Sequence, residues 1–304
     1  MLQWKRKGTM HHSDLLPGTL WPAIVQRTAR ALRSGALCPI ETVQSSIEDG
    51  GVRFLVRQVS SLARKEKAGR TGNAGGNPFL PYDPDLFVAD VSDTHVALLN
   101  KFNVIAHHLL IVTRHFEPQE SLLTEADCAA LLACMAEFGS LGFYNGGAAA
   151  GASQGHKHLQ IVPLPFAEDG PALPIGPLLE SAPMTGTIGT VPGLAFAHAF
   201  APLDIFAAPA HAMARTVCEY YRTLLETVGV PVTEAGSELR QSAAYNLLVM
   251  SEGLLLVPRF HEFVEGISVN ALGFAGSLFV RDVAQMQVIE RVGPMHLLRR
   301  AAAA

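Results

Sequence analysis

The residues whose types and spacing could do chemistry form one short series, His156-Lys157-His158-Leu159-Gln160. In an extended chain alternate side chains point to the same face, so His156, His158 and Gln160 would stand in a row about 7 Å apart. Leu159 would point to the opposite face, into a core. Three polar groups on one face of an otherwise apolar strand cost free energy unless they serve a site. The pattern therefore predicts a functional strand.

Three interpretations of this strand are open. The side chains could be buried and hydrogen-bonded without a catalytic role. A His-x-His pair could bind zinc, although neither a cysteine pair nor a carboxylate lies close in sequence to complete the ligand set. Neutral imidazole is abundant at pH 7, because its ordinary pKa is about 6.5. It could attack phosphorus and form a phosphoramidate, which divides one hard transfer into two easier steps.

The loop before the strand, residues 145–155, favours nucleophilic attack on a phosphate. Glycine lets the main chain approach a ligand closely, and successive N–H groups can hold phosphate oxygens. The glycines are Gly146, Gly147, Gly151 and Gly155, and the side-chain donors are Asn145, Ser153 and Gln154. A glycine-rich loop alone is weak evidence, but beside the histidine strand it predicts a phosphate site.

Helical patterns occur in segments that could support such a strand. Residues 121–139 have the clearest signals, because Thr124 is a good N-cap, Asp127 can complete a capping box, and Gly139 suits the C-terminus. Two further segments show helical spacing of apolar residues, at 1–36 and 211–228.

Short apolar segments occupy most of the remaining chain and predict strands. The expected strands are residues 52–59, 86–91, 95–102, 107–113, 156–165, 243–250, 253–259 and 277–283. A loop at 63–84, rich in glycine, proline and charge, is long enough to suggest a functional or mobile segment. Residues 166–210 are rich in proline and should hold only short strands. This mixture predicts an α+β fold.

Two of these strands resemble each other. Residues 107–114, HHLLIVTR, and residues 253–260, GLLLVPRF, are both apolar and both carry a basic residue near the end. Duplication of one ancestral unit would explain the similarity, and so would the shared composition of buried strands. His107 and His108 receive no role, because either could be a core or an exposed residue.

The composition of the 304-residue chain narrows the class of protein. Apolar residues make up 49% and charged residues 16%, which excludes a largely disordered chain. The net charge of −4 lacks the basic excess of nucleic-acid-binding proteins. Long apolar runs, a secretory signal and paired cysteine spacings are not found. We therefore expect a cytoplasmic protein with neither a nucleic-acid nor a membrane partner.

The His-x-His-x-Gln strand resembles the active-site strand of the histidine-triad superfamily, in the form of its transferase branch. Flanking segments resemble one group of that branch, the diadenosine tetraphosphate phosphorylases, also called ATP adenylyltransferases. These segments are NPFLPYDPDLF (77–87), NKF (100–102), HLLIVTRHFEPQ (108–119), GASQ (151–154) and SVNALGFAG (268–276). They lie within roughly residues 50–282, so the resemblance is more specific than the histidine motif alone.

The resemblance implies phosphorolysis of diadenosine tetraphosphate with phosphate to ADP and ATP, a reversible reaction. It makes His158 the nucleophile, which would expel ATP and form an adenylyl-histidine that phosphate converts to ADP. His156 would orient or polarise His158. Gln160 stands where hydrolases of the superfamily have a third histidine. It can hydrogen-bond a phosphoryl oxygen but cannot act as a general acid, and a polyphosphate leaving group needs little protonation.

Further positions take substrate-binding roles from the same resemblance. Those expected to hold phosphates are Asn145, Gly151, Ala152, Ser153 and Gln154. Lys65 would reach the distal phosphates, and a solvated lysine in a charged loop explains it equally well. Arg281 would clamp a terminal phosphate, or lie on the surface. The other expected contacts are Asp90 and Val91 beside the adenosine, and Asn270, Ala271, Leu272 and Ser277 in a C-terminal segment.

The resemblance also implies a HIT-like α+β fold, in which helices pack on a mostly antiparallel sheet. Residues 1–165 would form an N-terminal half with the histidine site, and residues 166–304 a C-terminal half that completes the substrate pocket. The two would make one compact unit, and they could be related. The partners would be diadenosine tetraphosphate, ATP, ADP and phosphate. No covalent cofactor or protein-bound metal is expected, and Mg²⁺ can accompany the polyphosphate. The oligomeric state stays open.

Other functions remain as alternatives. A related transferase could act on a sugar phosphate or on adenylyl sulfate, although the flanking segments disfavour uridylyl transfer to sugars. A non-catalytic nucleotide sensor is a second alternative, against which the intact His158 and Gln160 argue. A metal-dependent hydrolase is a third, and a covalent adduct on histidine would distinguish the transferase from it.

Overall fold

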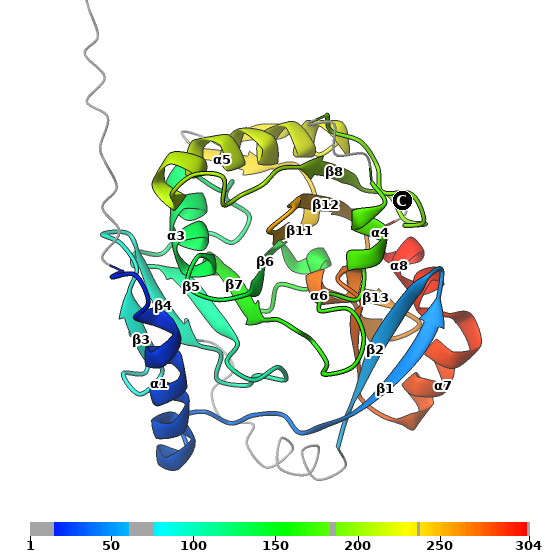
Figure 1. Ribbon diagram of the computed structural model, residues 1–304, viewed down its shortest axis with the longest axis horizontal. Helices are drawn as coiled ribbons and strands as arrows, with labels where there is room; N and C mark the ends of the chain where they lie inside the picture. The colour runs from blue at the N-terminus through cyan, green and yellow to red at the C-terminus, as the bar shows by residue number, and fades with distance from the viewer. Residues whose placement is uncertain (1–14, 61–75, 183–186, 236–237, 303–304) are drawn as a thin grey trace, which may run out of the picture.

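The computed structural model describes residues 15–60, 76–182, 187–235 and 238–302. Its centre is an eight-stranded sheet in the order β3-β4-β5-β7-β6-β11-β12-β8, in which every neighbouring pair is antiparallel (Figure 1). The strands are β3 (Phe87–Asp90), β4 (His95–Leu99), β5 (Leu109–Thr113), β6 (Ser140–Gly146), β7 (His158–Pro163), β8 (Ala199–Pro202), β11 (Ala244–Met250) and β12 (Gly253–Arg259). The predicted α+β class with a mostly antiparallel sheet is confirmed.

Strand β6 joins the two halves of the chain. It pairs with β7 on one side and with β11 on the other, so both halves contribute to one continuous sheet. In this register Asn145 of β6 lies opposite Asn246 of β11. The start of the glycine loop is therefore held against the C-terminal half. The two similar segments supply β5 and β12 of the same sheet, and the duplication hypothesis stays open.

Three helices cover one face of the sheet (Figure 1): α1 (Leu20–Ser34), α3 (Glu125–Met135) and α5 (Ala210–Thr227). Between them and the strands lies a core that includes Leu109, Leu159 and Leu247. Alternate strand residues enter this core because side chains of a strand alternate between its faces. We call this side of the sheet the helix face.

Helix α3 begins as predicted and ends earlier than predicted. The Thr124 hydroxyl accepts from the Asp127 N–H, and the Asp127 carboxylate accepts from the Thr124 N–H, which completes the capping box. The helix ends at Met135 with Ala136 as its cap. Gly139 lies beyond the end of the helix and does not adopt the left-handed conformation of a capping glycine; its carbonyl accepts from the Leu164 N–H as the chain enters β6.

The N-terminal helix is also shorter than the predicted 1–36. It begins at Leu20, and residues 15–19 are not helical. Residues 1–14 lie outside the described residues. Gly35 ends the helix in the left-handed conformation (φ 74°), and its N–H donates to the carbonyl of Leu32.

Elements from both ends of the chain cover half of the other face. A three-stranded sheet of β1 (Thr42–Asp49), β2 (Val52–Val59) and β15 (Ser277–Val280) packs there over a second core that includes Val56, Phe143 and Leu255. The helices on this side are α4 (Gly176–Glu180), α6 (Ala271–Phe274), α7 (Val283–Val292) and α8 (Pro294–Ala301). The remaining short elements are η1 (Ala148–Ala150), β9 (Val232–Ala235), β10 (Glu238–Gln241), β13 (Phe263–Val264) and β14 (Ile267–Ser268).

The strand predicted at 277–283 stops at Val280. Asp282 is the N-cap of α7, and its carboxylate accepts from the Gln285 N–H. A capping aspartate removes the chain from extended geometry, because its side chain satisfies a free N–H group of the first helical turn. The two C-terminal helices that follow were not predicted.

Over β4, β5 and β7 the described residues on this second face form a small apolar cluster. Val96, Leu98, Leu110 and Val112 meet there beside Phe79. We call this side of the sheet the open face. Within the described ranges, no helix has both the length and the apolar character that crossing a membrane requires.

Candidate active site

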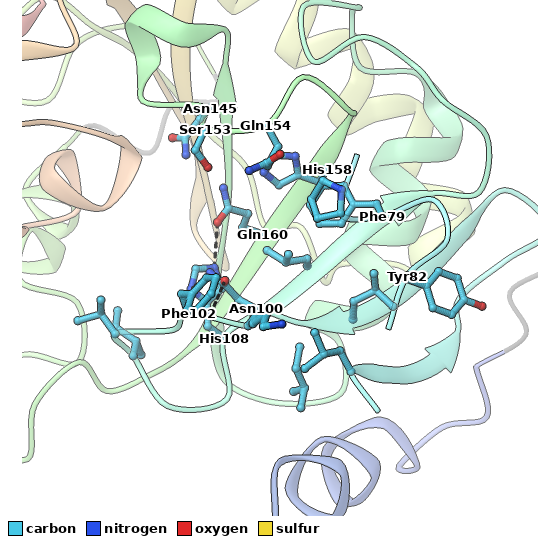
Figure 2. A pocket seen from close by; sticks show the side chains of 18 of the residues that line it. Phe79, Tyr82, Asn100, Phe102, His108, Asn145, Ser153, Gln154, His158 and Gln160 are labelled. Carbon is cyan, nitrogen blue, oxygen red and sulfur yellow. Dashed lines mark hydrogen bonds between the residues drawn. The ribbon is translucent and has the colours of Figure 1, made fainter. Parts of the chain in front are cut away.

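A cavity of about 650 Å³ lies on the open face. Strands β5, β6 and β7 contribute to it together with the 78–86 and 98–105 segments and α6. The lining residues labelled in Figure 2 are Phe79, Tyr82, Asn100, Phe102, His108, Asn145, Ser153, Gln154, His158 and Gln160. Of the other predicted residues, Gly151, Asn270 and Leu272 also line it. The histidine strand, the glycine loop and the C-terminal segment therefore meet at one place.

His158, the first residue of β7, offers a free ring nitrogen to this cavity. Its Nδ1–H donates to the carbonyl of His156 (2.8 Å), and its Nε2 has no hydrogen-bond partner among the described residues. Burial lowers the pKa of His158 to about 4, so the ring is neutral at pH 7. A neutral imidazole whose Nδ1 carries the proton has its lone pair on Nε2. His158 is thus prepared to act as a nucleophile.

His156, by contrast, has no free ring nitrogen. The Asn77 amide donates to Nδ1 (2.9 Å), and Nε2–H donates to the carbonyl of Thr113 (2.9 Å). The His156 side chain is not among the residues that line the cavity. The contact that orients His158 comes from the main-chain carbonyl of His156. Both rings pack against Phe79, and of the two only His158 keeps a ring nitrogen that no described residue contacts.

The amide of Gln160 has a defined orientation, set by His108 (Figure 2). An amide oxygen only accepts, so His108 Nε2–H donates to Gln160 Oε1 (2.9 Å), and His108 Nδ1 accepts from the Asn100 amide (3.2 Å). Burial lowers the pKa of His108 to about 4, which keeps it in this neutral form. The NH₂ group of Gln160 is left to donate to a ligand.

His108 is one residue of the site that the sequence did not single out. Its neighbour His107 lies on the helix face, where it contacts Thr28 and Trp21 of α1. The available signal was the two-residue period of β5, which places His108 on the same face as Leu110. That signal could not choose between the two histidines until the sheet had assigned its faces.

The amide of Asn145 is oriented like that of Gln160, with its oxygen bound by the protein and its NH₂ group free of hydrogen bonds to the described residues. Its Oδ1 accepts from the Asn246 amide (2.8 Å) and from the Ala271 N–H (3.0 Å). Its NH₂ group is therefore the part that remains for a ligand. Asn145 is 3% exposed, so this orientation is imposed by the protein and not by solvent.

Gln119 holds the strands that carry these groups. It is fully buried, and its amide nitrogen donates to the carbonyls of Asn145 (2.9 Å) and His158 (3.4 Å). Its oxygen accepts from the His158 N–H (2.9 Å). The end of β6 and the start of β7 diverge at this point. The Gln119 side chain therefore satisfies main-chain groups that the β6–β7 pairing leaves without a partner.

The glycine loop packs tightly against the C-terminal segment. Gly151 has a φ of 85°, and a Cβ placed there would lie 2.8 Å from the Cβ of Asn270. A side chain at Gly151 is excluded both by conformation and by contact. The loop continues to Ser153 and Gln154, whose N–H groups have no hydrogen-bond partner among the described residues. These N–H groups are available to hold an anion.

Aromatic residues form the other side of the cavity. Phe79 packs against the ring of His158 with a centroid distance of 5.3 Å, and Tyr82 and Phe102 lie further along the lining. Apart from the histidines, only Asp83 and Lys101 among the described lining residues can carry a charge. Apolar and aromatic walls beside oriented amide donors suit a ligand with a flat base and a phosphate.

The opposite side of the histidine strand carries a buried charged network. Lys157 is fully buried, and its Nζ contacts the carboxylates of Glu117 (2.6 Å) and Asp127 (3.1 Å). Asp127 also contacts His95 Nε2 (2.9 Å). Burial opposes the charged forms, but their mutual attraction outweighs it: the pKa of Asp127 falls to about 2, and that of Lys157 rises. Every charge in this network is paired within the protein.

Several predicted substrate residues lie outside the cavity lining. Asp90 forms an ion pair with Arg114, and Val91 is fully buried in the helix-face core. Ser277 is buried and accepts from Arg57, whereas Arg281 is exposed and its N–H donates to the Gln285 side chain. The binding roles of these four residues remain predictions.

The other predicted residues have defined places. The Ala152 N–H donates within the glycine loop to the carbonyl of Gly147 (3.2 Å), and the Ala271 N–H donates to Asn145. Lys65 lies outside the described residues. Among the residues that the structure describes, no group of three or more histidines, cysteines or carboxylates could hold a metal ion.

Two family models match successive parts of the chain. One, described as the Ap4A phosphorylase N-terminal domain, matches residues 10–181. The other, described as the ATP adenylyltransferase C-terminal domain, matches residues 192–304. Both agree with the resemblance found in the sequence motifs.

Curated relatives and solved structures point the same way. Protein APA1 of Saccharomyces cerevisiae is 27% identical over 294 residues, covering 88% of each chain. Diadenosine 5',5'''-P1,P4-tetraphosphate phosphorylase 2 of the same yeast is 27% identical over 263 residues, covering 77% of this chain and 78% of the relative. The crystal structure of yeast Ap4A phosphorylase Apa2 in complex with Ap4A matches with a TM-score of 0.71 at 22% identity, covering 96% of this chain and 97% of that one. This structural match shows a shared fold.

Proposed function

The chain belongs to the Ap4A phosphorylase family of nucleotidyltransferases, and from this premise we propose that it phosphorolyses diadenosine 5',5'''-tetraphosphate to ADP and ATP. One observation carries the proposal. In the part of the chain that the structure describes, the neutral His158 has an unpartnered Nε2 in a cavity where the amide NH₂ groups of Asn145 and Gln160 have no partner either. A nucleophile between donors that can bind phosphoryl oxygens is what adenylyl transfer requires.

The reaction has two displacements. In the first, Nε2 of His158 attacks the α-phosphorus of the dinucleotide, a P–N bond forms, and the P–O bond to ATP breaks. The positive charge that develops on the ring is stabilised by the Nδ1–H bond to the carbonyl of His156. In the second, an oxygen of inorganic phosphate attacks the same phosphorus and the P–N bond breaks. The products are ADP and free His158, so the electron pairs balance and the step can run backwards.

The amide donors stabilise the phosphoryl group as its charge moves. Gln160 and Asn145 donate to non-bridging oxygens, as preorganised donors do at other transferred groups. Neither can release a proton, which the ATP leaving group does not require because it is a weak base. The apolar side of the cavity, with Phe79 and Tyr82, takes a nucleoside. Mg²⁺ enters with the polyphosphate as part of the substrate.

The test follows the covalent intermediate. Diadenosine tetraphosphate labelled at the α-phosphate is incubated with the protein, first without and then with inorganic phosphate, and the protein mass and the nucleotides are measured. We expect an acid-labile AMP adduct that His158→Ala lacks and that phosphate converts to ADP. ATP and AMP as the only products, independent of phosphate, would identify a hydrolase. Binding without turnover would identify a sensor.

A further inference from the structure

Arg259, the last residue of β12, holds a buried guanidinium close to the candidate site. It is 2% exposed and donates to the carbonyls of Ala301 (3.3 Å), His261 (2.7 Å) and Val269 (2.8 Å). It also donates to the side-chain oxygen of Asn246, and its guanidinium lies over the ring of Phe274, 5.1 Å from the centroid. None of the ion pairs formed among the described residues includes it. A buried positive charge without a paired carboxylate is costly, so its placement needs a reason.

The three carbonyl contacts explain only part of that placement. They tie the end of β12 to the C-terminal helix and to the 261–269 segment, as a structural side chain would. The contact with Asn246 serves a different purpose, because Asn246 lies in β11, which is already paired with β12 through the main chain. Burial lowers the pKa of Arg259 to about 10, so the group stays protonated at neutral pH.

The contact with Asn246 determines which atoms of the neighbouring amides face which way. A guanidinium only donates, so the oxygen of Asn246 must face Arg259. The Asn246 nitrogen then donates to Asn145 Oδ1 (2.8 Å) and to the carbonyl of Ala150 (2.9 Å). The Ala271 N–H also donates to Asn145 Oδ1 (3.0 Å). With its oxygen engaged twice, Asn145 can offer only its NH₂ group to the cavity.

We propose that Arg259 is a positioning residue for the nucleotide phosphate: acting through Asn246, it turns the Asn145 amide so that this side chain presents a donor and no acceptor. An amide can otherwise rotate by half a turn with little change in shape, which would place an oxygen against the phosphate. An ionised phosphate oxygen only accepts. The contacts from Arg259 through Asn246 to Asn145 therefore favour binding of an anionic phosphate. The identity of the anion as a nucleotide phosphate rests on the proposed function.

A double-mutant cycle between Arg259 and Asn145 tests this inference, with AMP and adenosine as the titrated ligands in calorimetry. Arg259→Met and Asn145→Ala are each expected to weaken AMP binding about 10-fold, as the loss of a hydrogen bond to a charged group does. The double variant is expected to show the same loss of about 10-fold, because Arg259 acts through Asn145. Adenosine binding should change by less than about two-fold throughout, since adenosine has no phosphate.

One conservative variant and one replacement variant separate positioning from a merely structural role. Arg259→Lys keeps a cationic donor for Asn246 and is expected to bind AMP within about three-fold of the unmodified protein. If Arg259→Met does not fold, Asn246→Ala takes its place in the cycle with the same expectations. It removes the middle of the chain of contacts and leaves the three carbonyl contacts of Arg259.

Three results would overturn the inference: additive losses of AMP affinity in the double variant, an equal weakening of adenosine, or an unmodified protein that binds AMP no more tightly than adenosine. The titrations need no turnover. An unmodified protein that binds AMP and does not phosphorolyse diadenosine tetraphosphate would overturn the proposed function alone.

Discussion

The two faces of the histidine strand handle polar groups in opposite ways. On the helix face Lys157 contacts the carboxylates of Glu117 and Asp127, and each charge of that network is paired. On the open face His158 and Gln160 are neutral, and each keeps one hydrogen-bonding group that no described residue contacts. Both faces are buried, so burial alone does not distinguish structure from function.

The useful distinction is whether hydrogen-bonding capacity is left over. A buried charge whose partners are all within the protein stabilises one arrangement and can do little else. A neutral side chain whose free donor or lone pair faces a cavity can exchange water for a ligand without breaking a hydrogen bond within the protein. The histidine strand is therefore stabilised by contacts on the helix face and binds substrate on the open face.

The largest expected effect separates chemistry from stability on the open face. His158→Ala removes the free Nε2 and is expected to reduce phosphorolysis by about 10³-fold or more, because the covalent step is lost. The melting temperature should stay near that of the unmodified protein. Intact-mass measurement should find no AMP adduct. The control is His211→Ala on α5, an exposed histidine whose loss should leave the activity unchanged.

A substitution on the helix face should lower the stability of the protein and leave the chemistry intact. Lys157→Met leaves Asp127 buried without its cation, and we expect the free energy of unfolding to fall by about 3–5 kcal/mol. Urea unfolding measures this, with the exposed Arg299→Met as control at about 0.5 kcal/mol or less. At low temperature the folded variant should still form the AMP adduct. A loss of less than about 1 kcal/mol would contradict the structural role of the network.

Gln160→Glu sharpens the comparison by placing a charge on the open face with almost no change of shape. The carboxylate can still accept from His108, but it turns a negative oxygen toward the phosphoryl group. We expect kcat/KM for diadenosine tetraphosphate to fall about 10²- to 10³-fold, the range for losing one preorganised donor. Gln26→Glu on the exposed side of α1 is the matched control. Unchanged kinetics would remove Gln160 from the proposed mechanism.

The smallest expected effect is in the pH dependence. Protonated imidazole cannot attack, and burial lowers the pKa of His158 to about 4, so its neutral form persists to lower pH than in an ordinary histidine. Between pH 7.5 and 5 the single-turnover rate of adduct formation, measured without phosphate, should fall by less than about two-fold. An acid limb near pH 6.5 would mean that His158 is hydrated like an exposed histidine.

Local patterns predicted the elements that local physics decides. The Thr124 capping box and the apolar strands were found because their signals lie within a few residues of one another. The end of α3 was missed because Gly139, the expected cap, instead hydrogen-bonds to Leu164, which is distant in the sequence. The start of α7 was missed because the Asp282 cap directly follows the apolar segment that forms β15.

The candidate site was predicted in part. The residue pattern identified His158, Gln160, Asn145 and the glycine loop, and resemblance added Asn270 and Leu272; these residues line the cavity. His108, Asn246 and Arg259 were not identified, because they act on those residues from other strands. Their roles depend on pairings across the sheet that sequence spacing does not contain.

The sequence by itself determined which residue types alternate along the strand, and through family resemblance it determined the class of reaction. Only the tertiary structure decided which nitrogen of His158 is free and which way the amides of Gln160 and Asn145 point. The physical reason is that hydrogen-bond polarity is relayed between partners far apart in the chain. Each donor fixes the orientation of the next acceptor, and the sheet must form before those partners meet.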